Sequence, residues 1–330
     1  MKLVLTEEQR QLRETVRSFL AAVSPLSEVR RAAESETGYD PAVYRRLNGE
    51  LGLAGLIVPQ EHGGAGAGYA ELAVVLEETG AALLPGPFLA TTLAAILLTE
   101  LGDELGDKEL LPDIAAGTMV ATVALDGDRA LNGAEAEVVL TVDGARVRIV
   151  RDGTRTPLTT LDPTRRQARV ELGGGAAVAV SEAVLARVRD LFAVAVAAEQ
   201  LGVLRASLDA IVAYAKIRVA FGRFIGSYQG VKHKLADMHC KLEQAESIVR
   251  HAAWAADEAP GELPLAAALA QAYVGRACFE VAGDSLLLHG GIGFTWEHDA
   301  HLYYKRAKSD EVLLGPPRVH RARLADLLEL

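Results

Sequence analysis

The densest group of chemically capable side chains lies in the segment RVAFGRFIGSYQ, residues 218–229. Arg218 follows a long apolar stretch, a Phe221–Gly222 step interrupts that stretch, and Gln229 opens the next amphipathic pattern. Arginine can bind a phosphate through two parallel hydrogen bonds, an aromatic ring can cover another ring, and an amide both donates and accepts. The segment is therefore compatible with a site for an extended nucleoside polyphosphate, but these residue types alone favour an ordinary polar turn.

Other chemical motifs receive less support. The glycine-rich stretch 63–68 lacks the Gly-Lys-Ser/Thr ending of a phosphate-binding loop, so a tight connection between helices is expected there. His298 and His301 have helical spacing but no third ligand elsewhere, which favours a solvated helix start over a metal site. The only cysteines, Cys240 and Cys278, are expected to be small core residues. No Gly-x-Ser-x-Gly nucleophile motif occurs.

Composition narrows the class of protein. The 330 residues are 50% hydrophobic and carry a net charge of −10. The negative charge argues against binding to nucleic acid or to an anionic membrane, and the apolar content favours a large core and subunit interfaces. The N-terminal MKLVLTEEQRQL has acids where a signal peptide would be apolar, so we expect a cytoplasmic protein.

Periodicity divides the chain into three expected domains of a mostly helical α+β protein. Residues 1–118 alternate helical patterns with loops, including a helix at 41–51 with Asp40 as its cap and a capping box at Thr6 and Gln9. Residues 119–180 contain β-branched runs and an Asp-Gly hairpin signal, which predict a small antiparallel domain. Residues 181–330 return to the helical period, with one long helix over 181–220, and predict a bundle of four helices.

Three segments together resemble the acyl-CoA dehydrogenase family. The first is IRVAFGRFIGSYQGVKHKLADM, which matches the family's Arg-x-x-Phe-Gly turn and the glutamine after it. The others are GLAGLIVPQEHGGAG near the N-terminus and LLLHGGIGFTWEHDAHLYYKRAK near the C-terminus. The resemblance covers nearly the whole chain and implies FAD bound at a subunit interface. It places the contacts to a neighbouring subunit's FAD on Arg218, Phe221 and Gln229, and on the Gly290–Gly291 step.

The sequence departs from this family where the reaction needs a base. Abstraction of an α-proton from a thioester needs a carboxylate near the substrate. By the resemblance, Leu314 stands at the usual position of that glutamate and Phe192 at the other known location, and neither side chain accepts a proton. Asp310 and Glu199 are weaker alternative bases. We therefore assign no catalytic residue to this chain.

A second departure concerns the flavin ring. The β region lacks the tryptophan and the Thr-Glu pair that hold the ring in the family, and Leu287 stands where a glutamine usually precedes the Gly-Gly step. With both departures, the chain resembles the non-catalytic subunit of heteromeric actinobacterial acyl-CoA dehydrogenases. That resemblance implies an α₂β₂ complex in which a larger catalytic partner supplies the base and most of the flavin site. The implied substrate is an acyl-CoA, such as one derived from a steroid side chain or from another lipid.

Two alternatives stay open at this point. The chain could be a self-sufficient homo-oligomeric dehydrogenase with a relocated base. It could also be a flavin-independent scaffold or an acyl-CoA-binding protein that retains only the fold.

Overall fold

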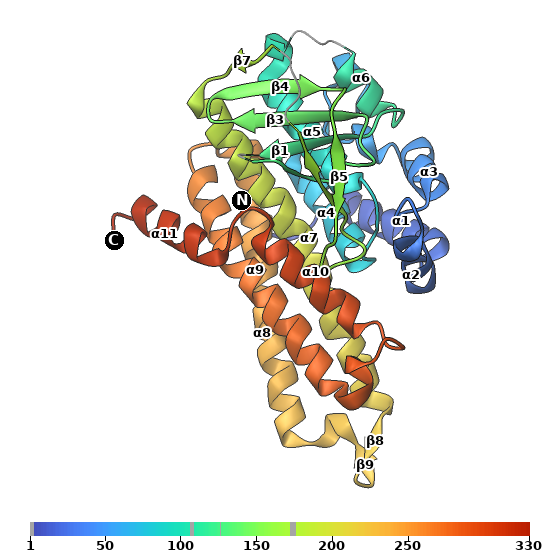
Figure 1. The fold of residues 1–330 in the computed structure, drawn as a ribbon. Helices are drawn as coiled ribbons and strands as arrows, with labels where there is room; N and C mark the ends of the chain where they lie inside the picture. The colour runs from blue at the N-terminus through green and yellow to red at the C-terminus, as the bar shows by residue number, and fades with distance from the viewer. Residues whose placement is uncertain (1–2, 106–108, 126, 172–175) are drawn as a thin grey trace. The chain divides into compact units, whose positions relative to one another are not determined.

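The computed structural model describes residues 3–105, 109–125, 127–171 and 176–330, and it divides into two compact units (Figure 1). The first unit combines Ala73–Leu83 and Ala193–Leu330 with the N-terminal residues up to Ala21. The second contains Ala22–Leu72 and Leu84–Phe192. The fold is α+β and mostly helical, as the sequence predicts, and strands β1–β7 all belong to the second unit.

Long helices run side by side in the first unit (Figure 1). In this unit, α9 (Leu263–Leu288) packs against α8 (Gln229–Glu258), α10 (Ala300–Leu313) and α11 (Pro317–Leu327). The helix α7 (Glu182–Ile217) joins this bundle, because Ser285 of α9 donates its hydroxyl to Ser207 O of α7 at 2.9 Å. Many buried positions of α8 and α9 are alanines, and such short side chains let neighbouring helices approach closely.

The composition of α7 is that of a core helix. Among the described residues it is the one helix long and apolar enough to cross a membrane, and 89% of its qualifying 18-residue window is buried in the protein. Ser181 caps it, because its hydroxyl accepts a hydrogen bond from Ala183 N at 3.2 Å. The helix ends at Ile217, earlier than the predicted Ala220, because residues 219–220 form a strand instead.

The N-terminal helix α1 (Glu7–Val23) begins with the predicted capping box. Thr6 N donates to the Gln9 side chain at 3.0 Å, and Gln9 N donates to the Thr6 hydroxyl at 3.2 Å. These reciprocal bonds satisfy backbone donors that the first turn of a helix leaves unpaired. Together with the Ala73–Ala81 part of α4 (Tyr69–Ala81), most of this helix belongs to the first unit.

The first unit contains a buried ionic cluster centred on Glu77, whose side chain is 0% exposed. Arg13 of α1 approaches its carboxylate at 3.2 Å and Arg205 of α7 at 2.8 Å, and Arg250 of α8 pairs with it as well. Burial opposes the charge of Arg205, but Glu77 and Glu246 outweigh burial and raise the pKa of its guanidinium. Charged side chains from four helices thus meet around the Glu77 carboxylate.

Two glycines let α4 and α7 approach at backbone distance near this cluster. A Cβ on Gly202 would stand 1.8 Å from Glu77 O, and a Cβ on Gly80 would stand 2.2 Å from Glu199 O. Real Cβ atoms do not approach a carbonyl oxygen so closely, so only glycine fits at either position. The two contacts therefore fix the register of α4 against α7.

The second unit contains helices beside its strands. They are α2 (Leu26–Glu34), α3 (Pro41–Leu51), α5 (Phe88–Leu101) and α6 (Leu110–Ala115), with short 3₁₀ turns at Leu53–Gly55, Gln60–His62 and Gly102–Leu105. Asp40 caps α3 as predicted, since its carboxylate accepts from Ala42 N at 2.8 Å. The glycine-rich segment 59–68 is a loop with a single 3₁₀ turn, as predicted.

The strands form two sheets instead of one antiparallel array. One sheet has the order β1-β3-β4-β7 and the other β2-β6-β5. The strands are β1 (Ala121–Leu125), β2 (Arg129–Leu131), β3 (Val138–Asp143), β4 (Arg146–Val150), β5 (Arg155–Leu158), β6 (Gln167–Val170) and β7 (Val178–Ala179). The expected antiparallel hairpin forms between β3 and β4, with Gly144 at its turn.

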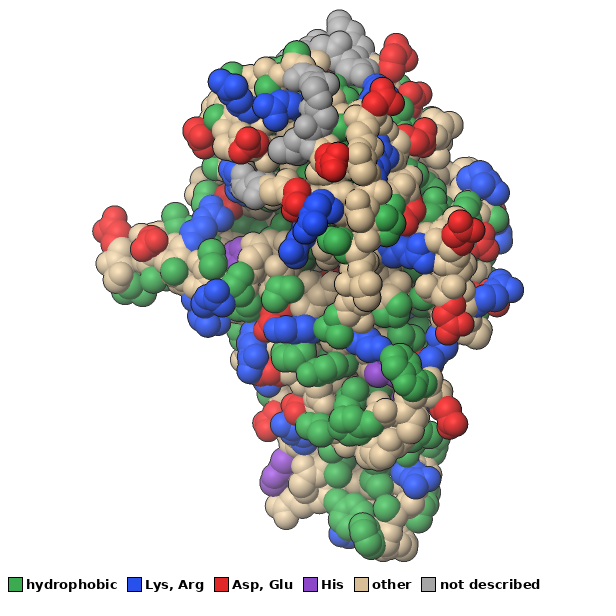
Figure 2. Space-filling view, in the orientation of Figure 1, with side chains coloured by type: hydrophobic (Ala, Val, Ile, Leu, Met, Phe, Trp, Pro, Cys, Tyr) green, Lys and Arg blue, Asp and Glu red, His purple; other side chains and the backbone are tan. Residues whose placement is uncertain are grey.

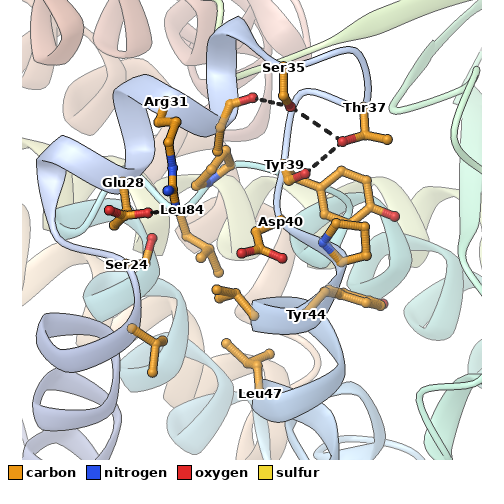
Figure 3. Close-up of a pocket in the computed structure, with 15 residues that line it drawn as sticks. Ser24, Glu28, Arg31, Ser35, Thr37, Tyr39, Asp40, Tyr44, Leu47 and Leu84 are labelled. Atoms are coloured by element: carbon orange, nitrogen blue, oxygen red, sulfur yellow. Dashed lines mark hydrogen bonds and ion pairs between the residues drawn. The ribbon is translucent and has the colours of Figure 1, made fainter.

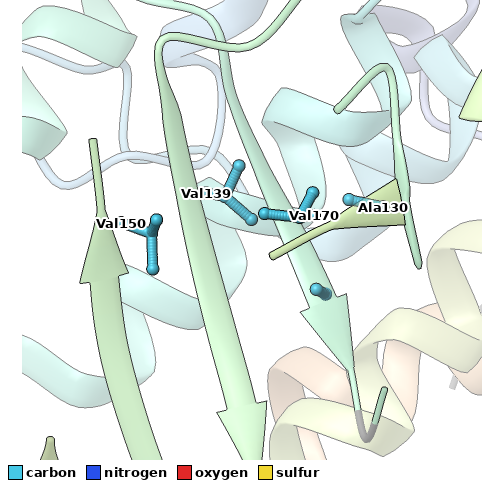
Figure 4. Close-up of a cluster of buried hydrophobic side chains, with 5 residues drawn as sticks. Ala130, Val139, Val150 and Val170 are labelled. Carbon is cyan, nitrogen blue, oxygen red and sulfur yellow. The ribbon is translucent and has the colours of Figure 1, made fainter. Parts of the chain in front are cut away.

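The expectation of purely antiparallel pairing is wrong for β1 and β3, which pair in parallel from Ala121↔Val138 onward. The reason is the path between them. The chain leaves β1, forms β2 in the other sheet, and returns so that Glu137 N donates to Val120 O at 2.8 Å. Five small side chains from both sheets fill the space between them (Figure 4): Ala124, Ala130, Val139, Val150 and Val170.

The two cysteines differ in their surroundings. Cys278 of α9 is buried, and burial together with nearby acids raises the pKa of its thiol well above the ordinary value, so it is an unreactive core residue as predicted. Cys240 is exposed, so its assignment to the core is wrong. It lies on α8 between the buried Met238 and Leu242, two residues from each, and therefore on the opposite face of the helix.

Replacement of Gly202 by alanine tests the contact between α4 and α7. Gly202→Ala is expected to destabilise the protein by about 1–3 kcal/mol, because a backbone oxygen cannot move aside as a flexible side chain would. Gly49→Ala is the matched control, since a Cβ at this α3 position has no heavy atom within 4 Å. It should stabilise by about 0.5–1 kcal/mol through helix propensity. Thermal unfolding measures both, and equal shifts would refute the constraint.

Candidate functional site

The segment singled out by sequence forms a short hairpin between α7 and α8. Its strands are β8 (Val219–Ala220) and β9 (Arg223–Phe224), and the two residues between them have positive φ, 51° at Phe221 and 78° at Gly222. Positive φ at both central residues defines the type I′ turn, which favours asparagine or glycine. A phenylalanine in this conformation is strained, and such strain concentrates at functional positions.

Tyr228 holds the hairpin in place. Its hydroxyl donates to Ala220 O at 2.8 Å, and the Arg223 guanidinium lies 3.8 Å from the centre of its ring. Ile225 N also donates to Arg218 O at 2.8 Å. These contacts hold the turn in a fixed position relative to Gln229. Gln229 is the first residue of α8, as the sequence predicts.

The hairpin presents its side chains outward. Phe221 is 98% exposed, and Arg218 and Gln229 are exposed as well. Figure 2 shows hydrophobic side chains gathered at the end of the first unit where β8 and β9 lie in Figure 1. The large exposed apolar residues of the segments that flank this end are Ile217, Val219, Phe221, Phe224, Leu287, Ile292, Phe294 and Trp296. Large exposed apolar patches mark interaction sites in soluble proteins.

The Gly290–Gly291 step also faces open space. It follows α9 in a 3₁₀ turn, Gly290–Phe294, and Gly290 has a φ of 68°. A Cβ built on either glycine would have no heavy atom within 4 Å. The bare backbone of this step is therefore available for close approach by a ligand or by another chain.

An aromatic cluster brings the two segments to the same end of the bundle. The Tyr214 ring of α7 lies 4.7 Å from the His289 ring, and the His289 ring lies 4.3 Å from that of His298. His298 also accepts a hydrogen bond at 3.1 Å from the backbone N–H of Ala300, the first residue of α10. Sequence reasoning missed this cluster, although Tyr214 precedes Arg218 by one helical turn and His289 precedes Gly290 directly. No group of acids, histidines and cysteines suited to a metal occurs among the described residues.

The residues at the two expected base positions do not belong to the hairpin or to the Gly290–Gly291 step. Leu314 is the C-terminal cap of α10 and is partly buried, and His320 contacts its carbonyl oxygen at 3.1 Å. Phe192 is 1% exposed in α7. Each of these residues therefore has a packing role in the helices.

The alternative acids are both buried in the first unit, at 2% exposure for Glu199 and 0% for Asp310. Glu199 forms an ion pair with Arg306 of α10 at 3.5 Å, and the Arg306 side chain is itself 0% exposed. Separating such a buried pair would leave an uncompensated charge and would cost several kcal/mol. Glu199 therefore acts as a structural partner of Arg306, and Asp310 lies one turn later on the same helix.

Comparison with known proteins identifies the family. A model of the acyl-CoA dehydrogenase N-terminal domain matches residues 6–118, and a model of the C-terminal domain matches residues 190–328. The chain belongs to the acyl-CoA dehydrogenase family. It is 40% identical to acyl-CoA dehydrogenase IpdE2 of Mycolicibacterium smegmatis over 97% of this chain and 98% of that protein. It is also 37% identical to FadE34 of Mycobacterium tuberculosis over 96% of this chain but 47% of FadE34.

Solved structures of acyl-CoA dehydrogenases share the fold closely. The Tcur3481–Tcur3483 steroid ACAD variant matches with a TM-score of 0.90 and 27% identity, over 98% of both chains. The ChsE4–ChsE5 complex from Mycobacterium tuberculosis matches with a TM-score of 0.87 and 26% identity, over 100% of this chain and 99% of the other. The acyl-CoA dehydrogenase fold therefore spans the whole chain.

Relief of the strain at Phe221 is expected to stabilise the protein. Asparagine tolerates positive φ, and Phe221 loses almost no packing because it is 98% exposed. Phe221→Asn should therefore raise the free energy of unfolding by about 1 kcal/mol. Phe224→Asn is the control, because Phe224 is also exposed but has a φ of −58°. Thermal unfolding compares them, and a loss of stability in Phe221→Asn would show that the turn is unstrained.

The histidine cluster makes stability depend on pH. Burial lowers the pKa of His289 from its ordinary value of 6.5, the hydrogen bond to Ser285 O opposes this, and His298 adds to it. The unfolded chain then binds more protons than the folded chain just below pH 6.5. The stability that His289 contributes is therefore complete above that pH and declines as the pH falls below it.

His289→Phe tests this dependence. The phenyl ring can still pack on Tyr214 but binds no proton, so the loss of stability below pH 6.5 should be smaller in this variant. The exposed His233→Phe serves as the control. Thermal unfolding between about pH 5 and pH 8 covers the range in which histidine titrates. An unchanged pH profile in His289→Phe would exclude His289 as the source.

Proposed function

We propose that this chain is the non-catalytic subunit of a heteromeric acyl-CoA dehydrogenase and that it completes the FAD site of a larger catalytic partner. The main support for the proposal is the conformation and exposure of Phe221 at the tip of the hairpin. Phe221 is strained and 98% exposed, and the backbone of Gly290–Gly291 is open to a ligand at the same end of the bundle. A side chain held in this way contributes nothing to its own subunit, so its partner lies outside the chain.

The residues at this end fit the polyphosphate and nucleoside parts of FAD. Arg218 supplies a cation with a planar set of donors, and Gln229 supplies an amide at the start of α8. The ring of Phe221 is free to cover an aromatic group, and Gly290 and Gly291 let a phosphate approach the backbone. FAD, when bound, accepts a hydride from the β-carbon of an acyl-CoA thioester.

A catalytic base for this chain has little structural support. Leu314 and Phe192 cannot accept a proton, and Glu199 is engaged with Arg306. We therefore assign proton abstraction to the partner subunit. This chain's role is to bind the outer half of FAD and to stabilise the complex through its exposed apolar end.

The similar proteins support a paired assembly. One of the similar structures is a complex of two named subunits, and another is a two-component steroid ACAD. In FadE34 the matching region is 47% of a longer polypeptide, as expected if two such subunits were fused. These relatives favour a steroid-derived acyl-CoA as the substrate of the complex and a cytoplasmic location.

Flavin content tests the proposal directly. The chain expressed alone should hold little FAD and show no dehydrogenase activity, whereas the complex with its partner should be yellow and active. Arg218→Ala should weaken FAD binding by the complex about 10- to 100-fold, the typical effect of losing a hydrogen bond to a charged group. Arg276→Ala, at a half-exposed arginine of α9 paired with Glu280, is the control.

Two results would overturn this assignment. A stoichiometrically flavinated chain that is active alone would show a self-sufficient dehydrogenase, and loss of turnover in Glu199→Gln or Asp310→Asn with FAD retained would then identify the base. Unchanged flavin content and activity in the Arg218→Ala complex would instead show that this end does not bind FAD.

A further inference from the structure

A cavity of about 350 Å³ opens among the helices of the second unit, between α2 and α3 (Figure 3). Ser24, Glu28 and Arg31 line it from the α2 side, and Tyr39, Asp40 and Tyr44 from the side of α3 and the turn before it (Figure 3). Its remaining wall is mostly apolar and consists of Val23, Ala32, Pro41, Val43, Leu47, Leu84 and Pro85, with Ser35 and Thr37 at the connecting loop. This volume lies within the range of small-molecule sites.

The loop that closes the cavity is fixed. Arg166 donates hydrogen bonds to Ser35 O and Glu36 O, and a Cβ on Gly38 would stand 2.0 Å from the Arg166 Nε. The Tyr39 ring lies where a Cβ on Gly86 would meet it at 2.8 Å. These contacts hold the loop and its aromatic ring in one position, so the cavity is formed before a ligand arrives.

Charge at the cavity disfavours an anionic ligand. Arg31 is the one cation among the lining residues, and it pairs with Glu28. Asp40 adds a further negative charge while one of its oxygens accepts from Ala42 N. The lining therefore has a net charge of −1, from two acids and one arginine. A carboxylate or the phosphates of coenzyme A would meet repulsion here.

Ser24 provides a hydrogen-bonding group that the protein does not use. It is 6% exposed, and no described residue forms a hydrogen bond with its hydroxyl. The other loop hydroxyls are engaged locally, since Ser35 donates to Ala32 O at 2.6 Å and Thr37 donates to Tyr39 O at 2.8 Å. Because no side chain of the protein occupies it, this hydroxyl is available to a molecule in the cavity.

We infer that this cavity binds a neutral, largely hydrocarbon molecule whose single hydroxyl or carbonyl group pairs with Ser24. The apolar wall suits a hydrocarbon frame, and the Ser24 hydroxyl can donate to a carbonyl or exchange hydrogen bonds with an alcohol. This site is independent of the proposed FAD-binding end, because every lining residue belongs to the second unit.

Titration calorimetry of the full chain with two probes tests the site. Adamantanol and adamantanecarboxylate share a hydrocarbon frame and differ in charge. Adamantanol should bind saturably and at least tenfold more tightly than the carboxylate. Ser24→Ala should weaken adamantanol binding about fivefold, the effect of one lost hydrogen bond. Ser18→Ala, at an exposed serine of α1, should leave it unchanged.

A substitution that fills the cavity provides a second test of the site. Val43 is a partly exposed residue of α3 that lines the cavity, so Val43→Trp should fold, occupy the cavity and abolish adamantanol binding. Circular dichroism and thermal unfolding confirm that the variant is folded. The inference fails if adamantanol does not bind, if it binds Val43→Trp as well as the native chain, or if the carboxylate binds equally well.

Discussion

The helical unit depends on a carboxylate that has lost all contact with water. Moving an ion from water into a protein costs several kcal/mol unless compensating charges surround it. Glu77 meets this requirement with Arg13, Arg205 and Arg250, so α1, α7 and α8 must each place an arginine at one point on α4. Gly80 and Gly202 bring the backbones of α4 and α7 close enough to permit this arrangement. This compensation therefore constrains how α1, α4, α7 and α8 pack against one another.

The packing of these helices also determines the position of the exposed hairpin between α7 and α8. Arg205 of α7 and Glu246 of α8 form an ion pair at 2.9 Å, which aligns the two helices well before the hairpin that connects them. Tyr214 and His289 extend the alignment to α9, so the hairpin and the Gly290–Gly291 step share one end. The packed interior thus supports an outward face on which Phe221 is 98% exposed. A packed interior with an exposed binding face suits a protein that contributes binding residues to a neighbouring subunit.

Local sequence signals predicted much of this arrangement, because they act over a few residues. The capping box at Thr6, the Asp40 cap and the start of α8 at Gln229 all depend on neighbours within a turn. The parallel pairing of β1 with β3 was not predictable in this way, since it depends on where a distant return path ends. The partners of Glu77, the cavity at Ser24 and the strain at Phe221 likewise arise from contacts or torsions that spacing does not encode.

The cluster of exposed aromatic and aliphatic side chains at the hairpin end has a consequence for the cell. Ile217, Phe221, Phe224, Phe294 and Trp296 would all face solvent in an orphan copy of the chain. Such surfaces attract chaperones and proteases and favour aggregation. If the chain has the partner proposed above, surplus copies would be cleared while assembled copies persist, and turnover as well as expression would match the amounts of the two polypeptides.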